Sequence, residues 1–130
     1  MKKALLLLAL IPSLSSASNI GPIKTALTKF QPVTVVDNAG DLQVITEQAT
    51  VKNTLYRKIV TQGICIPLHK SNILNGIKTI SVLNKAKNQG YKFKGGKDAC
   101  TEMAAIKSQV SEIFLMRHSE AILPPEPKAK

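Results

Sequence analysis

The pattern of apolar and polar positions predicts a β-hairpin over residues 33–46. Residues 33–36 are Val-Thr-Val-Val and residues 42–46 form a second apolar stretch, so both segments favour strands. Residues 37–41, Asp-Asn-Ala-Gly-Asp, have the composition of a turn. A helix that begins at Asp41 is the alternative, because the apolar positions after it also share one helical face.

Residues 47–62 fit either a helix or a strand. An apolar stripe with helical spacing starts at Val51, and Gly63 has the left-handed freedom that often ends a helix. The same stretch is rich in β-branched residues, which favour strands. We predict helix or loop in the first half and a mostly extended segment over residues 55–68, with a buried centre at Ile64, Cys65 and Ile66.

A further helix and a short strand are expected between residues 71 and 94. Ser71 is a good N-cap residue, and it is followed by a helical stripe of Ile73, Leu74, Ile77, Ile80 and Leu83. Gly76 weakens this prediction, because a glycine inside a helix costs about 1 kcal/mol. Gly90 would end the helix, and residues 91–94 would then form an alternating strand.

The C-terminal part of the chain predicts one long helix from Asp98 to about His118. The negative charge of Asp98 at its start and the positive charge of Arg117 near its end suit the helix dipole. One apolar face would contain Met103, Ile106, Val110, Ile113 and Phe114. Leu115 and Met116 point away from that face, so they either pack under a neighbouring loop or expose an apolar contact for a partner.

Together these elements predict an α+β protein, in which a small, mainly antiparallel sheet packs against a long C-terminal helix. Residues 33–122 are expected to form a single domain with one modest core. Residues 18–32 are expected to be an extended lead-in, with a short helix around residues 23–30 as the alternative. Residues 123–130, rich in proline and lysine, are expected to be a mobile tail.

The first residues have the order of a secretory signal peptide. Two lysines precede an apolar run, and small residues follow it up to Ala17, so we expect residues 1–17 to be cleaved. The alternative is an uncleaved membrane anchor. No later stretch approaches the roughly 20 apolar residues of a transmembrane helix. The sequence therefore predicts a periplasmic or secreted protein.

The chain contains two cysteines, Cys65 and Cys100. In an exported protein they most economically form one disulfide, which would fix the start of the C-terminal helix to the buried extended segment. Their separation excludes a CxxC redox motif, and two histidines add no metal-ligand spacing. We therefore expect a structural disulfide and neither a metal nor a cofactor.

Positive charge is concentrated in the middle of the chain. The formal net charge is +10, and loss of Lys2 and Lys3 with the signal peptide leaves +8. No acidic residue lies between Glu47 and Asp98, where the candidate binding residues are found: Lys78, Lys85, Lys87, Lys92, Lys94 and Lys97. We expect them to form one face that attracts an acidic protein or an anionic envelope component. The alternative is that these lysines only keep the protein soluble.

Catalysis has little support in the sequence. His69 and His118 suit the base and acid of a small nuclease, but their spacing does not require them to meet. The eight acidic residues avoid the middle of the chain, and no Gly-x-Ser-x-Gly motif is present. Tyr91 and Phe93 would share one face of a strand, which more often packs into the core than stacks on bases. Nucleic acid is therefore not a favoured partner.

The sequence thus favours a non-catalytic, exported binding protein of the bacterial cell envelope that engages an acidic partner through its lysine-rich face. Within the binding proteins, a periplasmic inhibitor or immunity protein is the alternative. From another class, a small secreted hydrolase such as a nuclease is the alternative.

Overall fold

The structure, a computed structural model, describes residues 20–32 and 34–124. The predicted signal peptide at residues 1–17 and most of the predicted tail at residues 123–130 lie outside these ranges. The described residues form an α+β structure with a five-stranded sheet and one disulfide. The predicted fold class is confirmed at this level.

The strands are neighbours in chain order: β1 (Thr34–Asn38), β2 (Asp41–Ile45), β3 (Thr79–Leu83), β4 (Gly90–Phe93) and β5 (Ser119–Ile122). β2 and β3 pair in parallel, and the other pairs are antiparallel. The sheet is therefore mixed, which corrects the mainly antiparallel sheet expected from the sequence. A crossover between β2 and β3 accounts for the parallel pair, because it returns the chain to the end of the sheet where β2 began.

The predicted hairpin is confirmed as β1 and β2, and the alternative helix from Asp41 is wrong. Asn38 pairs with Asp41 across a tight turn in which Ala39 and Gly40 have positive φ angles of 54° and 95°. Turns of this kind match the twist of the flanking strands. The Gly40 N–H also donates a hydrogen bond to the Asp37 carboxylate at 2.9 Å.

The crossover is one continuous helical segment: α2 (Asn53–Lys58), the π-helix η3 (Ile59–Cys65) and α3 (Ile66–Leu68). The mostly extended segment predicted over residues 55–68 is therefore wrong. Core packing outweighs the strand preference of its β-branched residues, since Val60 is completely buried in this helical form. Ile64 and Cys65 are buried as expected, whereas Ile66 is 56% exposed.

The segment before β1 is helical: α1 (Gly21–Ala26) and the 3-10 helix η2 (Thr28–Phe30). The extended lead-in predicted for residues 18–32 is therefore wrong here. The short helix predicted around residues 23–30 as its alternative is closer to the structure. Ile23 and Leu27 are completely buried, which holds this segment on the core. Gly63 of η3 allows the close approach, because a Cβ atom there would lie 2.5 Å from Leu27 Cδ2.

The helix predicted after Ser71 is a single turn, η4 (Asn72–Leu74). Ser71 caps it, since its Oγ accepts a hydrogen bond from the Ile73 N–H at 2.8 Å. The prediction that this helix continues to Leu83 is wrong, because β3 follows. β3 is buried from Ile80 to Leu83, so it lacks the alternation that distinguishes a strand from a buried helix.

The predicted long C-terminal helix is two helices, α4 (Lys97–Ala104) and α5 (Ser108–Arg117), followed by β5. Lys107 has an extended backbone with φ −65° and ψ 150°, so the helical phase restarts after it. The buried face consequently differs from the predicted one. Val110 and Ile113 are 50% and 56% exposed, whereas Leu115 is completely buried and Met116 is 38% exposed.

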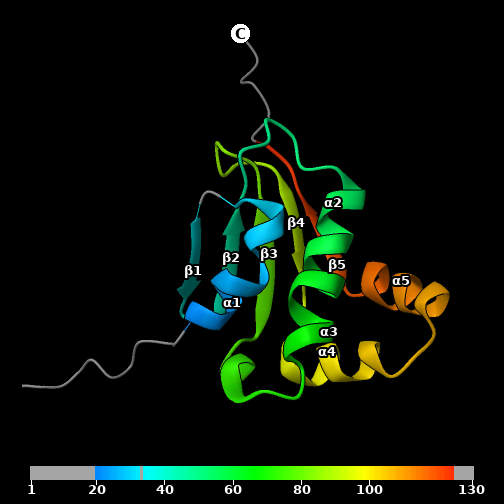
Figure 1. Ribbon diagram of the computed structural model, residues 1–130. Coiled ribbons are helices and arrows are strands. Elements are labelled where there is room, and N and C mark those ends of the chain that lie inside the picture. Colours follow the sequence, from blue (N-terminus) through cyan, green and yellow to red (C-terminus); the bar gives the residue numbers. More distant parts are fainter. Residues whose placement is uncertain (1–19, 33, 125–130) are drawn as a thin grey trace, which may run out of the picture.

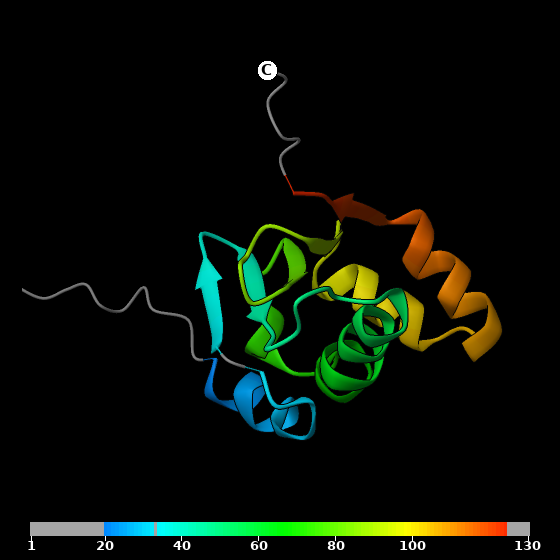
Figure 2. The same ribbon diagram turned by 90° about the horizontal axis from the view of Figure 1, so that it is seen from above.

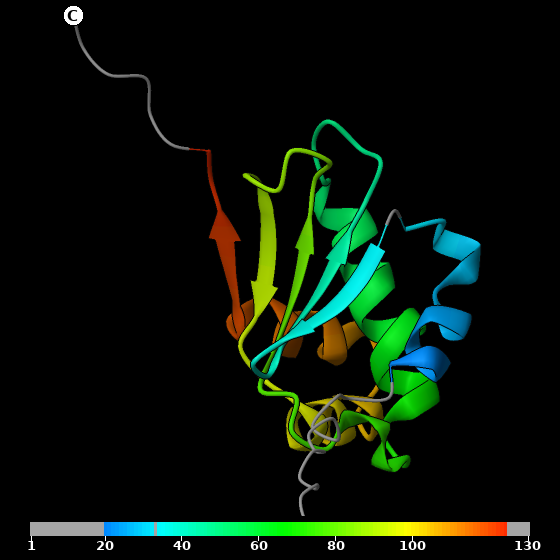
Figure 3. The ribbon, with the colours of Figure 1, turned by 90° about the vertical axis from the view of Figure 1, so that its left-hand side faces the viewer.

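The helices lie on one face of the sheet and at one of its ends, and the other face carries no helix within the described residues (Figures 1 and 3). The view from above shows α5 beyond the β5 edge (Figure 2). The helix-covered face supplies core residues from four strands: Val35, Leu42, Val44, Ile80, Val82 and Phe93. The opposite face, called the free face below, carries alternate side chains: Val36, Gln43, Ser81, Lys92 and Glu120.

The predicted disulfide is confirmed between Cys65, the last residue of η3, and Cys100 in α4. Both cysteines are completely buried. The bond fixes the start of α4 to the crossover as expected, although the crossover is helical.

Tyr56 links α2 to the far edge of the sheet. Its buried ring stacks on Tyr91, with centroids 4.9 Å apart. Its hydroxyl bonds the Ser119 hydroxyl, which donates a hydrogen bond to the Leu115 carbonyl at 2.6 Å. Burial raises the pKa of Tyr56 to about 12.

The raised pKa predicts a loss of stability at high pH. Between pH 10 and about 12 the folded protein keeps the Tyr56 proton that the unfolded chain releases. The free energy of unfolding should therefore fall by about 2 to 3 kcal/mol across this interval. Tyr56→Phe removes this fall and costs about 1 kcal/mol at neutral pH through the lost hydrogen bond. Chemical denaturation of the wild type and Tyr56→Phe at several pH values tests this. If the free energy of unfolding falls equally with pH in both proteins, the prediction is contradicted.

Candidate functional site

The predicted binding residues all lie on or next to the hairpin of β3 and β4: Lys78, Lys85, Lys87, Lys92, Lys94 and Lys97. Lys85 and Lys87 are exposed in the turn between the two strands. Lys92 and Lys94 lie on the free face, where Lys92 is opposite Ser81 in the strand register. The remaining two lysines lie at the other end of the hairpin.

These lysines do not gather at one point. Lys78 and Lys85 lie seven positions apart along mostly extended chain, which corresponds to about 20 Å. Charges at this distance are screened, since the Debye length is about 8 Å in physiological salt. Lys92 and Lys94 are only about 7 Å apart along one side of the chain. The structure therefore brings Lys92 and Lys94 together on the free face and places Lys78 and Lys85 at opposite ends of the hairpin.

The expected pattern of β4 is confirmed. Phe93 is completely buried and Tyr91 packs on Tyr56, whereas Lys92 and Lys94 remain accessible. Both aromatic rings thus face the helices. The free face has no aromatic ring from this strand on which a base could stack.

Ion pairs next to the lysines are loose. Lys94 Nζ lies 3.9 Å from Glu120 Oε1, and Lys85 Nζ lies 3.8 Å from Glu47 Oε1. All four side chains are more than half exposed. Pairs of this kind contribute at most about 1 kcal/mol. A partner carboxylate can therefore replace either glutamate at little cost.

A hydrogen-bonded cluster centred on Asp41 lies beside Lys92 on the free face. The Asp41 carboxylate accepts hydrogen bonds from Thr79 at 2.7 Å, Ser81 at 2.9 Å and Gln43 at 3.1 Å. The bonds from Thr79 and Ser81 join β2 to β3, and the three bonds together satisfy the carboxylate. The cluster is structural, and Lys92 is the cation that this face presents beside it.

The two histidines contact different elements. His118 stacks on Phe114, with centroids 4.2 Å apart, and its Nδ1 lies 2.8 Å from the Phe114 carbonyl oxygen. His69 follows α3, and its carbonyl accepts a hydrogen bond from Thr101 at 3.5 Å. No contact found in the described part of the chain joins the two rings. The structure thus provides no assembled acid–base pair.

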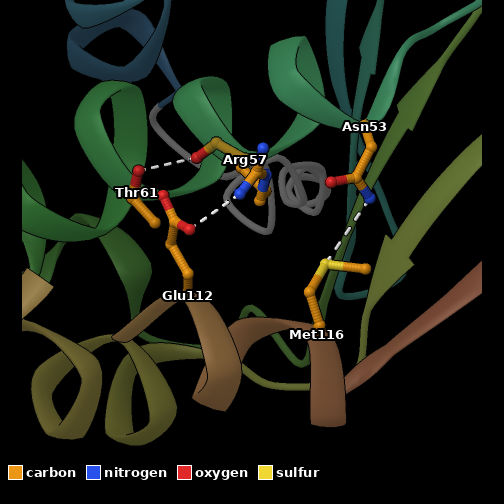
Figure 4. Close-up of polar contacts among 5 residues, drawn as sticks. All are labelled: Asn53, Arg57, Thr61, Glu112 and Met116. Carbon is orange, nitrogen blue, oxygen red and sulfur yellow. Dashed lines mark hydrogen bonds and ion pairs between the residues drawn. The ribbon is translucent and has the colours of Figure 1, made fainter. Parts of the chain in front are cut away.

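A second surface, which we call the α2–α5 groove, lies between the crossover helix and α5 (Figure 4). Arg57 Nη1 pairs with Glu112 Oε1 across it at 2.8 Å. Thr61 Oγ1 donates a hydrogen bond to the Arg57 carbonyl at 2.6 Å, and Asn53 Nδ2 lies 3.5 Å from Met116 Sδ. The Arg57–Glu112 contact joins residues 55 positions apart, so no local sequence signal predicts it.

The Arg57–Glu112 pair borders two hollows, of about 190 Å³ and about 420 Å³. The smaller one is lined by Thr61 and Gln62 of the π-helix and by Ile66 at its end. The larger one is lined by Ile113, Met116, Arg117 and Gln109 beside the ion pair. Short π-helical segments often occur at functional sites, so this groove is a candidate for binding as well.

No known protein family, curated protein or solved structure matches this chain. Within residues 20–32 and 34–124, no helix has the length and apolar character needed to cross a membrane. Over the same ranges, no group of three or more His, Cys, Asp or Glu side chains is placed to hold a metal ion. The function is therefore argued from the surfaces of the molecule.

Proposed function

We propose that this is a non-catalytic, exported binding protein of the bacterial cell envelope, which engages an acidic partner through the lysines of the β3–β4 hairpin. The observation that carries the proposal is the free face, which has no helical cover in the described residues (Figure 3). This face presents Lys92 and Lys94. Lysines on an open face suit a broad acidic surface better than a small anion that needs bidentate contacts. The lysines at the two hairpin ends add long-range attraction.

Two alternatives make different demands on the structure. A periplasmic inhibitor or immunity protein would bind an enzyme through the same lysines, so it is a special case of the proposal. A small secreted hydrolase would need the histidines, and the His118 ring stacks on Phe114 instead. Cleavage of RNA, DNA or peptidoglycan that is lost in a His69→Ala, His118→Ala double variant would favour the hydrolase.

Reversing Lys85, Lys92 and Lys94 to glutamate should slow association with the envelope partner by about tenfold or more. The partner is first isolated from envelope extract at low salt, and surface plasmon resonance then gives the association rate at increasing salt. The wild-type rate should fall steeply with salt, and the variant rate should change less. The fold should be kept, because surface substitutions usually change stability by only about 0.5 kcal/mol each.

The matched control reverses three exposed lysines outside the hairpin, Lys24, Lys29 and Lys52, and so changes the net charge equally. This control should lose much less of the association rate than the hairpin variant. Equal losses in the two variants would show that net charge alone attracts the partner. Unchanged kinetics in the hairpin variant would contradict the proposal.

A further inference from the structure

The α2–α5 groove is long enough to hold a segment of another protein. One wall extends along the crossover helix from Thr54 to Ile66, which is roughly 17 Å of helix. The other wall extends along α5 from Gln109 to Arg117, about 12 Å. A ligand that lies lengthwise can contact both walls and both hollows.

The groove combines positive charge with exposed apolar surface. Three cationic side chains line it: Arg57, Lys58 and Arg117. Three apolar side chains line it while largely accessible: Ile66 at 56%, Ile113 at 56% and Met116 at 38%. Glu112 is the single carboxylate of these walls. Exposed apolar side chains gathered between charged groups are typical of a contact site.

Glu112 occupies the place that a ligand carboxylate would take. It bonds Arg57 through Nη1, while the buried Arg57 Nε has no hydrogen-bond partner among the described residues. The guanidinium is therefore only partly satisfied. The Glu112 side chain is 59% exposed, and ion pairs with this exposure add little stability. An incoming carboxylate can exchange with Glu112 and bind the guanidinium in its place.

We infer that the α2–α5 groove is a docking site for an acidic, amphipathic segment of a partner protein. Its carboxylates pair with Arg57 and the neighbouring cations, and its apolar side chains pack on Ile113 and Met116. The excess of cations selects an acidic occupant, and the exposed apolar residues select an amphipathic one that lies along the groove. This site is separate from the lysines of the β3–β4 hairpin and does not depend on them.

The probe for this site is a fluorescein-labelled peptide with blocked ends that repeats the unit Leu-Glu-Glu-Leu. Fluorescence anisotropy measures its affinity for the full chain. Arg57→Gln should weaken binding about tenfold, because the anchoring cation is lost. Glu112→Gln should strengthen binding about threefold, because the competitor for Arg57 is lost. Ile113→Ser should weaken binding about tenfold through the lost apolar contact.

Charge-matched controls separate the groove from general attraction. Lys24→Gln and Glu47→Gln make the same changes in net charge on other surfaces, so they should leave the affinity within about twofold. Peptides with Gln in place of Glu, or Ser in place of Leu, should each lose binding. If thermal denaturation shows that Arg57→Gln is unfolded, Glu112→Gln and Ile113→Ser carry the test.

Three results would overturn the inference. In the first, the controls at Lys24 and Glu47 would shift the affinity as much as the groove variants do. In the second, the serine peptide would bind as tightly as the leucine peptide. In the third, reversal of Lys85, Lys92 and Lys94 would abolish binding that Arg57→Gln preserves, which would place the peptide on the hairpin.

Discussion

Replacing both cysteines with alanine should lower the free energy of unfolding by about 4 kcal/mol. The Cys65–Cys100 disulfide spans a sequence separation of 35 residues, and its removal returns conformational freedom to the unfolded chain. This loss is a large share of the roughly 5 to 15 kcal/mol that stabilises an ordinary protein. Alanine is preferred to serine because both sites are completely buried and a hydroxyl there would need a hydrogen-bond partner. Chemical denaturation under non-reducing conditions gives the difference.

Reduced wild-type protein is the matched control for this variant. Its free energy of unfolding should approach that of the double alanine variant, since both lack the cross-link. Mass spectrometry of protein prepared from the periplasm checks that the bond forms, through the mass of the hydrogens lost on oxidation. Equal stabilities of oxidised wild type and the variant would show that the bond adds nothing to the fold.

The sequence predicts the β1–β2 hairpin and the strand β4 because their signals are local. The turn around Gly40 needs residues that tolerate positive φ angles, and the chain supplies them between two β-branched stretches. Tyr91 and Phe93 alternate with lysines, as expected for a strand with one buried face. The disulfide is also predictable, since a chain that starts with the residue order of a signal peptide and has two cysteines has one economical pairing.

The helical crossover and β3 were not predictable because burial decides them. A strand buried from Ile80 to Leu83 shows an unbroken apolar run, which a helix can show as well. Val60 favours a strand by propensity, yet it lies in a helix that packs on the core. In α5 the extended backbone at Lys107 shifts the helical phase, so Leu115 replaces Ile113 on the buried side.

The candidate surfaces also combine features that are local in the sequence with features that depend on the fold. The number of lysines between Glu47 and Asp98 is plain from the sequence, and their separation along the hairpin depends on β3 being a strand. Had residues 73–83 been helical, the lysines would have gathered near one helix end. The Arg57–Glu112 pair depends on where the crossover and α5 meet, so only the three-dimensional structure reveals it.

Gly96→Ala should destabilise the protein by about 3 kcal/mol or more, because the new methyl group would collide with backbone. A Cβ atom at Gly96 would lie 1.9 Å from the Ile77 carbonyl oxygen. That carbonyl cannot move away freely, since the Ile77 N–H donates to Leu74 at 3.1 Å and the Lys78 N–H donates to Gly40 at 2.7 Å. Overpacking a site held in this way is strongly destabilising.

Gly76→Ala is the matched control, because it adds the same methyl group on a segment that lines one pocket together with Gly96. A Cβ atom at Gly76 would meet no atom of the described chain within 4 Å. Its φ angle of 85° still disfavours alanine, so a loss of about 1 to 2 kcal/mol is expected. Chemical denaturation gives the free energy of unfolding of the two variants. The loss in Gly96→Ala reports the collision, and the loss in Gly76→Ala reports the backbone strain. If Gly96→Ala is no more harmful than Gly76→Ala, then α4 can move away from Ile77 and its entry into the fold is not fixed by this contact.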